Sequence, residues 1–544
     1  MRALEVAASG AAAGALGRHL PPLLENRFAS RLFAEDATLW GRDAESEASI
    51  RLSWVSLPHS SRPLLEDIEQ LREQLHQDGV DHVVLCGMGG SSLAPEVICA
   101  TAGVDLTVLD SSHPDQVRAA LEDRLASTAV VVSSKSGSTV ETDSQRRAYI
   151  EAFTGAGIDP TTRIVIVTDP GSPLEQQARS DGYPVVTADP HVGGRYSALT
   201  AFGLVPSGLA GADIRALLDE AESATGLLSA DDESNPGLRL GAAIAGTSPL
   251  RNKLVIVDDG SGLAGFADWA EQLVAESTGK HGTGLLPVVV ADDSDPEVAL
   301  PPHDATVVRL VPDGHDNAVP AGDEIGPDDS AVTVRGSLGA QMLMWETAIA
   351  TAGRLLAINP FDQPDVESAK KAAREMLEGT PDSSDPAFVD DQVEVRALGP
   401  ADWLTGADTL TDAVARLLEQ LDNQHGYVAV MAYLDRTELT DLPDVRRILA
   451  LRARRPVTFG WGPRFLHSTG QFHKGGPSEG VYLQITGEPH QDLAVPGRDF
   501  TFGQLIAAQA AGDAQVLADH RRPVLRLHMR DQAVGLPAIR KALG

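Results

Sequence analysis

A run of hydroxyl residues after a predicted strand has the composition of an anion-binding loop. Residues 131–142 read V-V-S-S-K-S-G-S-T-V-E-T, and a helical pattern begins after Thr139. The amide groups and dipole at the start of a helix attract anions, and hydroxyl groups add further donors. Serine and threonine are also favoured as ordinary helix caps. The loop alone therefore indicates either phosphate binding or capping, and its candidate ligating residues are Ser134, Lys135, Ser136, Gly137 and Thr139.

A glycine-rich loop at residues 86–93, C-G-M-G-G-S-S-L, also follows a predicted strand directly. A dinucleotide-binding loop has the pattern G-x-G-x-x-G and an acidic residue about 20 positions later. Asp110 fits the acid, but Ser92 stands at the third glycine position. The loop therefore favours contacts from Gly89, Gly90 and Ser91 to a phosphate or a sugar, and it supports NAD binding only weakly.

Strand and helix patterns alternate around these loops. Apolar runs typical of buried strands occupy residues 82–85, 106–109, 129–132, 163–168 and 185–187. A second set begins near residue 210, with runs at 253–257, 285–290 and 307–311, and a third has runs at 427–434, 457–459, 481–485 and 524–527. Such alternation predicts parallel sheets with helices on both faces.

The predicted fold is therefore α/β, with two doubly wound domains of three α-β-α layers and a further C-terminal α/β region. Residues 1–62 are expected to form a helical segment, 63–209 and 210–385 the two domains, and 386–544 the C-terminal region. A chain of 544 residues requires more than one core. The polar, Pro-rich stretch at 379–386 is the expected linker.

The net charge of −33 disfavours nucleic acid as a partner, because phosphate backbones are held by Lys and Arg. The arginine-rich helix at 446–455 is accordingly predicted to be a solvated face. Two cysteines give no disulfide framework and no metal-ligand cluster. No apolar run approaches the ~20 residues that span a bilayer. Together these features predict a soluble protein of the reducing cytoplasm.

Longer motifs resemble those of one family. G-M-G-G-S-S-L followed by S-K-S-G-S-T-V-E-T resembles the sugar isomerase (SIS) domain, and the later motifs resemble phosphoglucose isomerases. These motifs are V-G-G-R-Y-S (192–197), E-Q-L-V-A-E-S-T-G-K (271–280), N-P-F-D-Q-P-D-V-E-S-A-K-K (359–371) and L-H-S-T-G-Q (466–471). The extended C-terminal region resembles the isomerase half of transaldolase–phosphoglucose isomerase fusions.

The resemblance implies two SIS-type domains and an enzyme that interconverts glucose 6-phosphate and fructose 6-phosphate in glycolysis and gluconeogenesis. It also implies a homodimer that needs no metal or redox cofactor. Two alternatives stay open: an isomerase that also accepts mannose 6-phosphate, and a regulator that binds sugar phosphates without catalysis. A regulator requires only the phosphate loop, so the joint presence of Glu276, Arg195 and Lys370 argues against it.

The resemblance assigns roles to these residues. Glu276 is expected to move a proton between C1 and C2 through an enediolate, and Arg195 to stabilise the negative oxygen of that intermediate. Lys370 is expected near the sugar ring oxygen, and Gln272 and Gln363 near the phosphate. By position alone, Glu276 is one acidic residue among 77.

Opening the sugar ring requires an acid near the ring oxygen, and imidazole titrates in the useful range. The matching motif assigns this role to His467, with His473 nearby as the alternative. In the family the histidine motif precedes the lysine motif, whereas here His467 follows Lys370. In the family this histidine comes from the neighbouring subunit, which loosens the constraint on chain order.

Overall fold

The structure is a computed structural model that describes residues 4–312, 329–378, 385–467 and 470–544. Its strands form three sheets, each largely or wholly parallel and accompanied by helices. The α/β fold class predicted from the sequence is confirmed. The predicted linker at 379–386 lies mostly outside the described residues.

The first sheet is wholly parallel and has the strand order β3-β2-β4-β5-β6. Its strands are β2 (His82–Gly87), β3 (Thr107–Leu109), β4 (Thr128–Ser133), β5 (Ile164–Thr168) and β6 (Val185–Thr187), and its helices are α5 (Leu64–Gln77), α6 (Leu93–Ala102), α7 (Pro114–Glu122), α8 (Val140–Gly155), α9 (Pro173–Ser180) and α10 (Ala201–Ala210). Val83 packs in the core that contains α10, whereas its neighbour Val84 packs against Tyr149 of α8. Successive strand residues point to opposite faces, so helices cover both sides of this sheet.

The second sheet has the order β1-β10-β9-β7-β8, in which only β1 is antiparallel. Its strands are β1 (Glu5–Ser9), β7 (Lys253–Asp258), β8 (Leu286–Val290), β9 (Ala305–Leu310) and β10 (Ser330–Arg335), with helices α1 (Gly10–Glu25), α2 (Phe28–Phe33), α3 (Arg42–Ala48), α4 (Leu57–Ser60), α11 (Ile214–Leu228), α12 (Pro236–Ala245), α13 (Phe266–Thr278), α14 (Pro296–Ala299) and α15 (Leu338–Leu355). The sequence did not predict β1 or β10. The residues of β1, EVAAS, have a weak strand preference, so pairing with β10 decides their conformation.

The third sheet has the order β11-β12-β16-β15-β13-β14. Its strands are β11 (Phe388–Asp390), β12 (Val393–Leu398), β13 (Tyr427–Tyr433), β14 (Val457–Trp461), β15 (Gly480–Gly487) and β16 (Val524–Met529), with helices α16 (Pro364–Glu378), α17 (Leu410–Leu418), α18 (Val445–Ala453), α19 (Gly470–Gly475), α20 (Phe502–Asp519) and α21 (Gln532–Leu543). Strands β13 to β16 run parallel, and the hairpin β11–β12 adds an antiparallel edge.

The second and third sheets share a hydrophobic core. Val255 of β7 and Val288 of β8 belong to the same buried cluster as Tyr427 and Met431 of β13. Ion pairs reinforce the junction: Arg446 lies 2.5 Å from Asp295 and 2.8 Å from Glu297, and Arg455 lies 2.6 Å from Asp304. The prediction that the 446–455 helix is a solvated face is therefore wrong for Arg446 and Arg455, which are buried.

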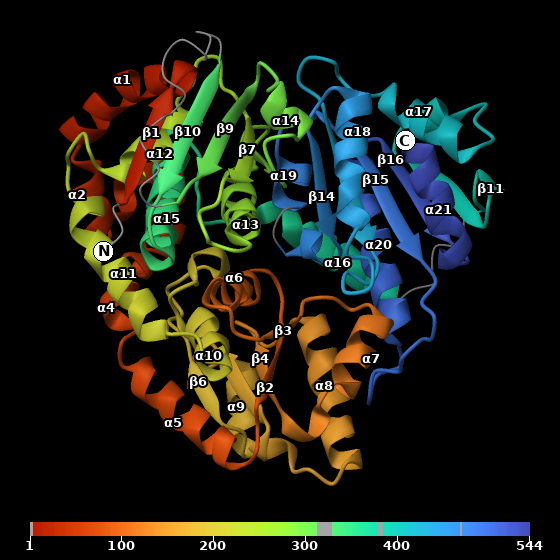
Figure 1. Cartoon of the computed structure of the whole chain (residues 1–544), viewed down its shortest axis with the longest axis horizontal. Helices are drawn as coiled ribbons and strands as arrows, with labels where there is room; N and C mark the ends of the chain where they lie inside the picture. Colours follow the sequence, from red (N-terminus) through yellow and green to blue (C-terminus); the bar gives the residue numbers. More distant parts are fainter. Residues whose placement is uncertain (1–3, 313–328, 379–384, 468–469) are drawn as a thin grey trace.

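Figure 1 shows the second and third sheets side by side above the first sheet, with α6 and α13 between the first and second. Each sheet and its helices form one unit, numbered here as the sheets are. Helix α13 contacts α6 and α19, and α16 contacts α19 and α20, so the three units meet in this central region. None of the helices in the described part of the chain is both long enough and apolar enough to cross a membrane.

Candidate active site

Helix α13 carries a buried carboxylate held between a glutamine and an arginine. Gln272 lies one helical turn before Glu276, and its Nε2 donates a hydrogen bond of 3.1 Å to Glu276 Oε2. Arg195 Nη1 lies 3.2 Å from Glu276 Oε1, and both side chains are buried. The structure therefore brings together three of the predicted site residues. A carboxylate fixed in this way can accept a proton from a substrate beside it.

The guanidinium of Arg195 is immobilised on every side. Its Nε donates to Ser277 Oγ (2.8 Å), and its Nη2 donates to the carbonyl oxygens of Pro360 (2.7 Å) and Asp362 (3.0 Å). Its Nη1 donates to Gln363 Oε1 at 2.6 Å, so Gln363 lies against the arginine. A cation held this rigidly needs no rearrangement to stabilise charge that develops nearby.

Lys280 supports this arrangement, and the sequence reasoning did not assign it a role. Its buried Nζ contacts Asn359 O (2.7 Å), Asp362 O (2.6 Å) and Asp362 Oδ1 (2.6 Å). Burial and the neighbouring Arg195 lower the pKa of Lys280 to about 8. Lys280 thus fixes the segment whose carbonyl groups hold Arg195. The sequence feature that could have indicated this role is the position of Lys280 as the last residue of the E-Q-L-V-A-E-S-T-G-K motif.

The glycine loop allows four segments to approach one another closely. Gly89 has φ = +54°, and a Cβ atom there would lie 3.1 Å from both Gln272 Nε2 and His467 O. A Cβ atom on Gly90 would lie 2.1 Å from the carbonyl oxygen of Gly194, in the turn that carries Arg195. Ser91 forms the end of this 3-10 turn, with its amide donating to Met88 O. The loop therefore joins α13, the Arg195 turn and the His467 segment.

Asp110, the acid that an NAD site would use, is engaged in a different contact. It lies buried between Arg464 (2.5 Å) and Arg436 (3.2 Å) from the third unit. Although burial alone raises the pKa of Asp110, the two arginines hold it below its ordinary value. This carboxylate joins the first and third units and does not lie open to a ribose.

The hydroxyl loop precedes α8 as predicted. Gly137 has φ = +74°, and a Cβ atom there would lie 2.4 Å from Leu174 Cβ. Thr139 is the residue before the helix, and its hydroxyl accepts a hydrogen bond from Ser134 (3.2 Å), while Ser136 and Ser138 are hydrogen-bonded to each other (2.7 Å). The first amide groups of any α-helix have no partner within the helix, so an anion can bind here.

A small cavity of about 170 Å³ connects this loop to the third unit. The lining includes Ser136, Thr139, Glu141, Lys370, His467 and Gln509. Two more predicted catalytic residues, His467 and Lys370, therefore face the predicted phosphate loop. Ser468 and Thr469 of the L-H-S-T-G-Q motif lie outside the described residues.

Within this cavity His467 is held by the buried carboxylate of Glu141, a residue in the first turn of α8 that is not among the predicted site residues. His467 Nε2 lies 2.7 Å from Glu141 Oε1, and the same oxygen accepts a hydrogen bond of 2.6 Å from Gln509 Nε2. Although burial alone raises the pKa of Glu141, His467 and Lys370 hold it below its ordinary value. An imidazole oriented by a carboxylate is suited to proton transfer. Glu141 and His467 are 326 positions apart, so no local pattern reveals the pair.

Two other candidate side chains lie elsewhere. Lys135 turns away from the hydroxyl groups: its Nζ lies 2.8 Å from Asp169 and donates to Val192 O at 2.9 Å. His473 is buried among aromatic rings, with its Nδ1 3.0 Å from the hydroxyl of Tyr427, and burial lowers its pKa to about 3. His467 is therefore the better placed of the two histidines for a reaction in the cavity.

Comparisons with known proteins identify the family of this chain. A probable glucose-6-phosphate isomerase of Haloarcula marismortui is 30% identical over 367 residues, which cover 60% of this chain and 84% of the relative. The chain belongs to the glucose-6-phosphate isomerase family. Another member, from a Synechococcus strain, is 30% identical over 58% of this chain and 70% of its own length.

Among solved structures, a hypothetical protein of Thermus thermophilus matches with a TM-score of 0.58 and 26% identity, over 70% of this chain and all of that protein. No protein-family model matches the chain. The family resemblance predicted from the motifs is thus confirmed, and the roles of individual residues stay predictions.

Proposed function

We propose that this protein is an isomerase that interconverts D-glucose 6-phosphate and D-fructose 6-phosphate, a step of glycolysis and gluconeogenesis. The observation that carries the proposal is the close approach at Gly89, where an added Cβ atom would lie 3.1 Å from both Gln272 Nε2 and His467 O. It brings α13, which carries Glu276 beside Arg195, next to His467 and the hydroxyl loop. Membership of the glucose-6-phosphate isomerase family supports it. A regulator without catalysis is not favoured, because these curated relatives are named as isomerases.

In the proposed reaction the phosphate binds at Ser134, Ser136 and Thr139 and at the start of α8. This non-reacting group fixes the position of the sugar, so that binding energy lowers the barrier at its other end. His467, held by Glu141 and with Lys370 nearby, donates a proton to the ring oxygen as the bond from that oxygen to C1 breaks. The C1 hydroxyl releases its proton to solvent, which gives the open-chain aldehyde.

Glu276 then removes the proton from C2 of the open-chain aldose. The electrons form an enediolate, whose negative oxygen is stabilised by Arg195. The hydroxyl proton on O2 passes to the negative O1, and the protonated Glu276 returns its proton to C1 as C2 becomes the carbonyl carbon, which gives the ketose and restores the carboxylate.

The experiment is a coupled assay of purified protein with fructose 6-phosphate as substrate and glucose 6-phosphate as the detected product. Turnover in wild type and a loss of about 10²–10⁴-fold in kcat for Glu276→Gln are expected, because that is the usual contribution of a general base. The exposed acid Glu151 on α8 provides the control, and Glu151→Gln should retain full activity. Absence of turnover in the wild-type protein would contradict the proposal.

We further propose a cytoplasmic location, a homodimeric assembly and no binding of nucleic acid. Two buried cysteines without a disulfide and the net charge of −33 support the first and third statements. The homodimer rests on the family resemblance alone. Light scattering on the purified protein measures the assembly, and gel shift at low salt tests nucleic acid.

A further inference from the structure

The third sheet reverses its winding direction between two of its parallel strands. From β13 the chain passes through α18 to β14 on one side, and then through α19 to β15 on the other side of β13. The strands β13 and β15 end at Tyr433 and Gly487. In open α/β sheets, small ligands bind outside the carboxyl ends of the strands at such a reversal.

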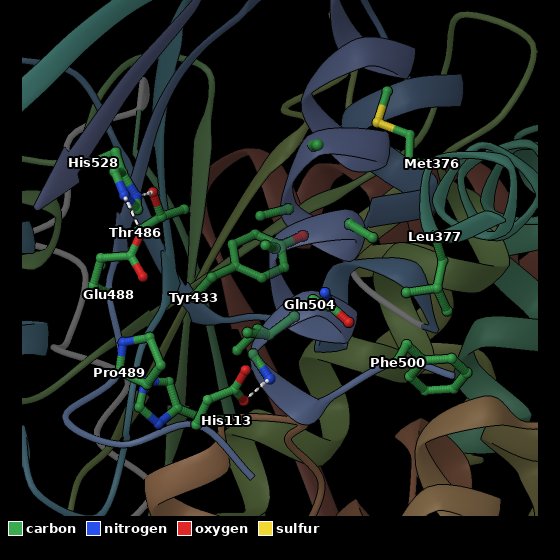
Figure 2. A pocket seen from close by; sticks show the side chains of 18 of the residues that line it. His113, Met376, Leu377, Tyr433, Thr486, Glu488, Pro489, Phe500, Gln504 and His528 are labelled. Carbon is green, nitrogen blue, oxygen red and sulfur yellow. Dashed lines mark hydrogen bonds and ion pairs between the residues drawn. The ribbon is translucent and has the colours of Figure 1, made fainter. Parts of the chain in front are cut away.

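A cavity of about 650 Å³ opens at this position, and both Tyr433 and Gly487 line it. This volume is within the range of small-molecule sites, which is roughly 300–1,000 Å³. Figure 2 shows His528 and Glu488 on one side of the cavity and Leu377 and Phe500 on the other, with Tyr433 between them. The lining thus combines apolar and aromatic side chains with a few polar groups, as in typical ligand sites.

Two arginines from neighbouring strands line the cavity, and Arg526 is held in place there by hydrogen bonds to Gln484 Oε1 (2.7 Å) and Ala510 O (3.3 Å). Arg396 of β12 and Arg526 of β16 are direct cross-strand partners, and both line the cavity. Arg396 is also paired with Glu394, and two guanidinium groups fixed on adjacent strands form a positively charged part of the cavity wall that favours an anion. Paired guanidinium groups are also the usual way to bind a phosphate or a carboxylate.

Four acidic residues also line the cavity, Glu394, Glu488, Asp492 and Asp499. The first three contact protein groups, and Glu488 lies 3.3 Å from His528. Glu394 lies beside both Arg396 (2.5 Å) and Arg530 (2.7 Å), and Asp492 accepts hydrogen bonds from the amides of Leu493 (2.7 Å) and Gly503 (2.8 Å). These contacts with cations and amide groups partly offset the negative charge that the carboxylates would otherwise present to an anion in the cavity.

A buried histidine at the edge of the cavity has unused hydrogen-bonding capacity. His113 is 1% exposed, and neither of its ring nitrogens has a hydrogen-bond partner among the described residues; Asp115 Oδ2 lies 3.9 Å from Nδ1. Burial lowers the pKa of His113 although Asp435 and Asp115 oppose the change, so the ring is neutral and offers one donor and one acceptor. Buried polar groups normally have partners, and a ligand in the cavity would supply one.

Helix α20 separates this cavity from the candidate active site. Leu505 and Gln509 line the smaller cavity beside His467, whereas Ile506, Ala507 and Ala510 line the larger one. The two cavities therefore lie on different sides of α20, with Leu377 of α16 lining both, and the larger one contains none of the predicted catalytic residues.

We propose that the larger cavity is a second ligand site, which binds a small organic anion carrying phosphate or carboxylate groups between Arg396 and Arg526. The inference does not depend on the proposed isomerase activity. It concerns a different cavity and is tested by a binding measurement without turnover.

The test uses a thiol introduced into the cavity by Ala507→Cys. Ala507 is exposed on the cavity wall, and the two natural cysteines are buried, so an alkylating reagent reports on this position. Inorganic pyrophosphate and citrate serve as probes for phosphate and carboxylate chemistry. At least one of them should slow alkylation fivefold or more at millimolar concentration, and the identity of the stronger probe distinguishes the two chemistries.

Matched arginine variants decide whether the protection belongs to the proposed site. Protection should disappear when Arg396→Gln or Arg526→Gln is combined with Ala507→Cys. It should persist with Arg530→Gln, because Arg530 contacts the same Glu394 and does not line the cavity. Circular dichroism checks that each variant is folded, and having two separate arginine variants keeps the test usable if one does not fold. Absence of protection by both probes, or protection that survives in the cavity variants, would overturn the proposal.

Discussion

The contact between Glu141 and His467 links two residues that the sequence presents as unrelated. Glu141 Oε1 accepts from His467 and Gln509, so it fixes the ring of the proposed acid. Glu141→Gln should lower kcat on cyclic substrate by about 10²-fold, because general acid catalysis depends on a correctly oriented proton donor. The assay compares the ring-closed substrate in wild type and variant.

Gln509→Ala removes only the second hydrogen bond to Glu141 and should cause a smaller loss. Equal losses in the two variants would indicate a structural role for both residues. An unchanged rate in Glu141→Gln would contradict the proposed orientation of His467.

Glu346 of α15 is a buried acid remote from this chemistry. It is fully buried, and neither carboxylate oxygen has a hydrogen-bond partner within the described structure. Burial raises the pKa of Glu346 well above its ordinary value, so the folded protein keeps a proton that the unfolded chain releases near pH 4.5. The folded protein therefore loses stability progressively as the pH rises above 4.5, the pKa of this carboxyl group in the unfolded chain.

Glu346→Gln should remove this pH dependence, since an amide does not titrate. Urea denaturation between pH 5 and pH 9 measures the free energy of unfolding of both proteins. The value for the variant should increase relative to that of wild type as the pH rises. Glu66→Gln on α5 is the exposed control and should follow wild type. A gap that stays constant across the pH range would disprove the assignment.

Individual residues were predicted with unequal success. The motifs selected Glu276, Gln272 and Arg195, which lie in contact in the structure: two of them are on one helix and the third follows two glycines in a turn. They did not predict that Lys135 would turn toward Asp169, since the direction of a flexible side chain depends on a partner from another strand. The choice of His467 over His473 also required the fold, which buries His473 among aromatic rings.

At the level of elements, the glycine loop after β2 determines how closely the units approach. A methyl group on Gly90 would lie 2.1 Å from the carbonyl oxygen of Gly194, and a backbone atom cannot move aside easily. Gly90→Ala should cost about 1–3 kcal/mol of stability, as overpacking usually does, and should reduce kcat by displacing the Arg195 turn.

Gly194 in the facing turn is the natural control. A Cβ atom there meets no other atom within 4 Å in the described structure, so Gly194→Ala should retain both stability and activity. Thermal denaturation and the coupled assay distinguish the two variants. Similar losses in both would show that the loop requires glycine for another reason.

Most strands and helices followed from hydrophobic pattern alone, because the parallel sheets are built from continuous apolar runs such as Ala129–Val132 in β4. The exceptions lie at the edges of the sheets or next to them. Strand β1 of the N-terminal segment pairs with β10, and β12 pairs with β16. The conformation of β1 and β12 therefore depends on partners that are far away in the sequence. The charged helix α18 was misjudged for the same reason, since its partners Asp295 and Glu297 lie in another unit.

At the scale of the whole molecule, a single chain places all the predicted catalytic residues in its central region. These are Glu276, Arg195, Lys370 and His467. His467 comes from the third unit of the same chain, whereas the resemblance implied a neighbouring subunit. Mixing inactive Glu276→Gln protein with inactive His467→Ala protein should therefore restore no activity. A site shared between subunits would regain activity when the two variants exchange partners.

The exchange experiment requires that subunits, if present, actually mix. The variants are therefore unfolded together in denaturant and refolded, with wild type treated in parallel to measure recovery. Activity that appears only in the mixed sample would show that a partner supplies the histidine.

The long separation between Glu141 and its partners also has a consequence for biosynthesis. Gln509 lies 368 positions after Glu141, and His467 lies 326 positions after it. On the ribosome, the hydroxyl loop and Glu276 emerge long before either partner has been translated. A growing chain can thus form its first two sheets while it is still inert toward ring-closed sugar. The proposed ring-opening acid, His467, is added only in the last part of synthesis, together with the strands of the third sheet.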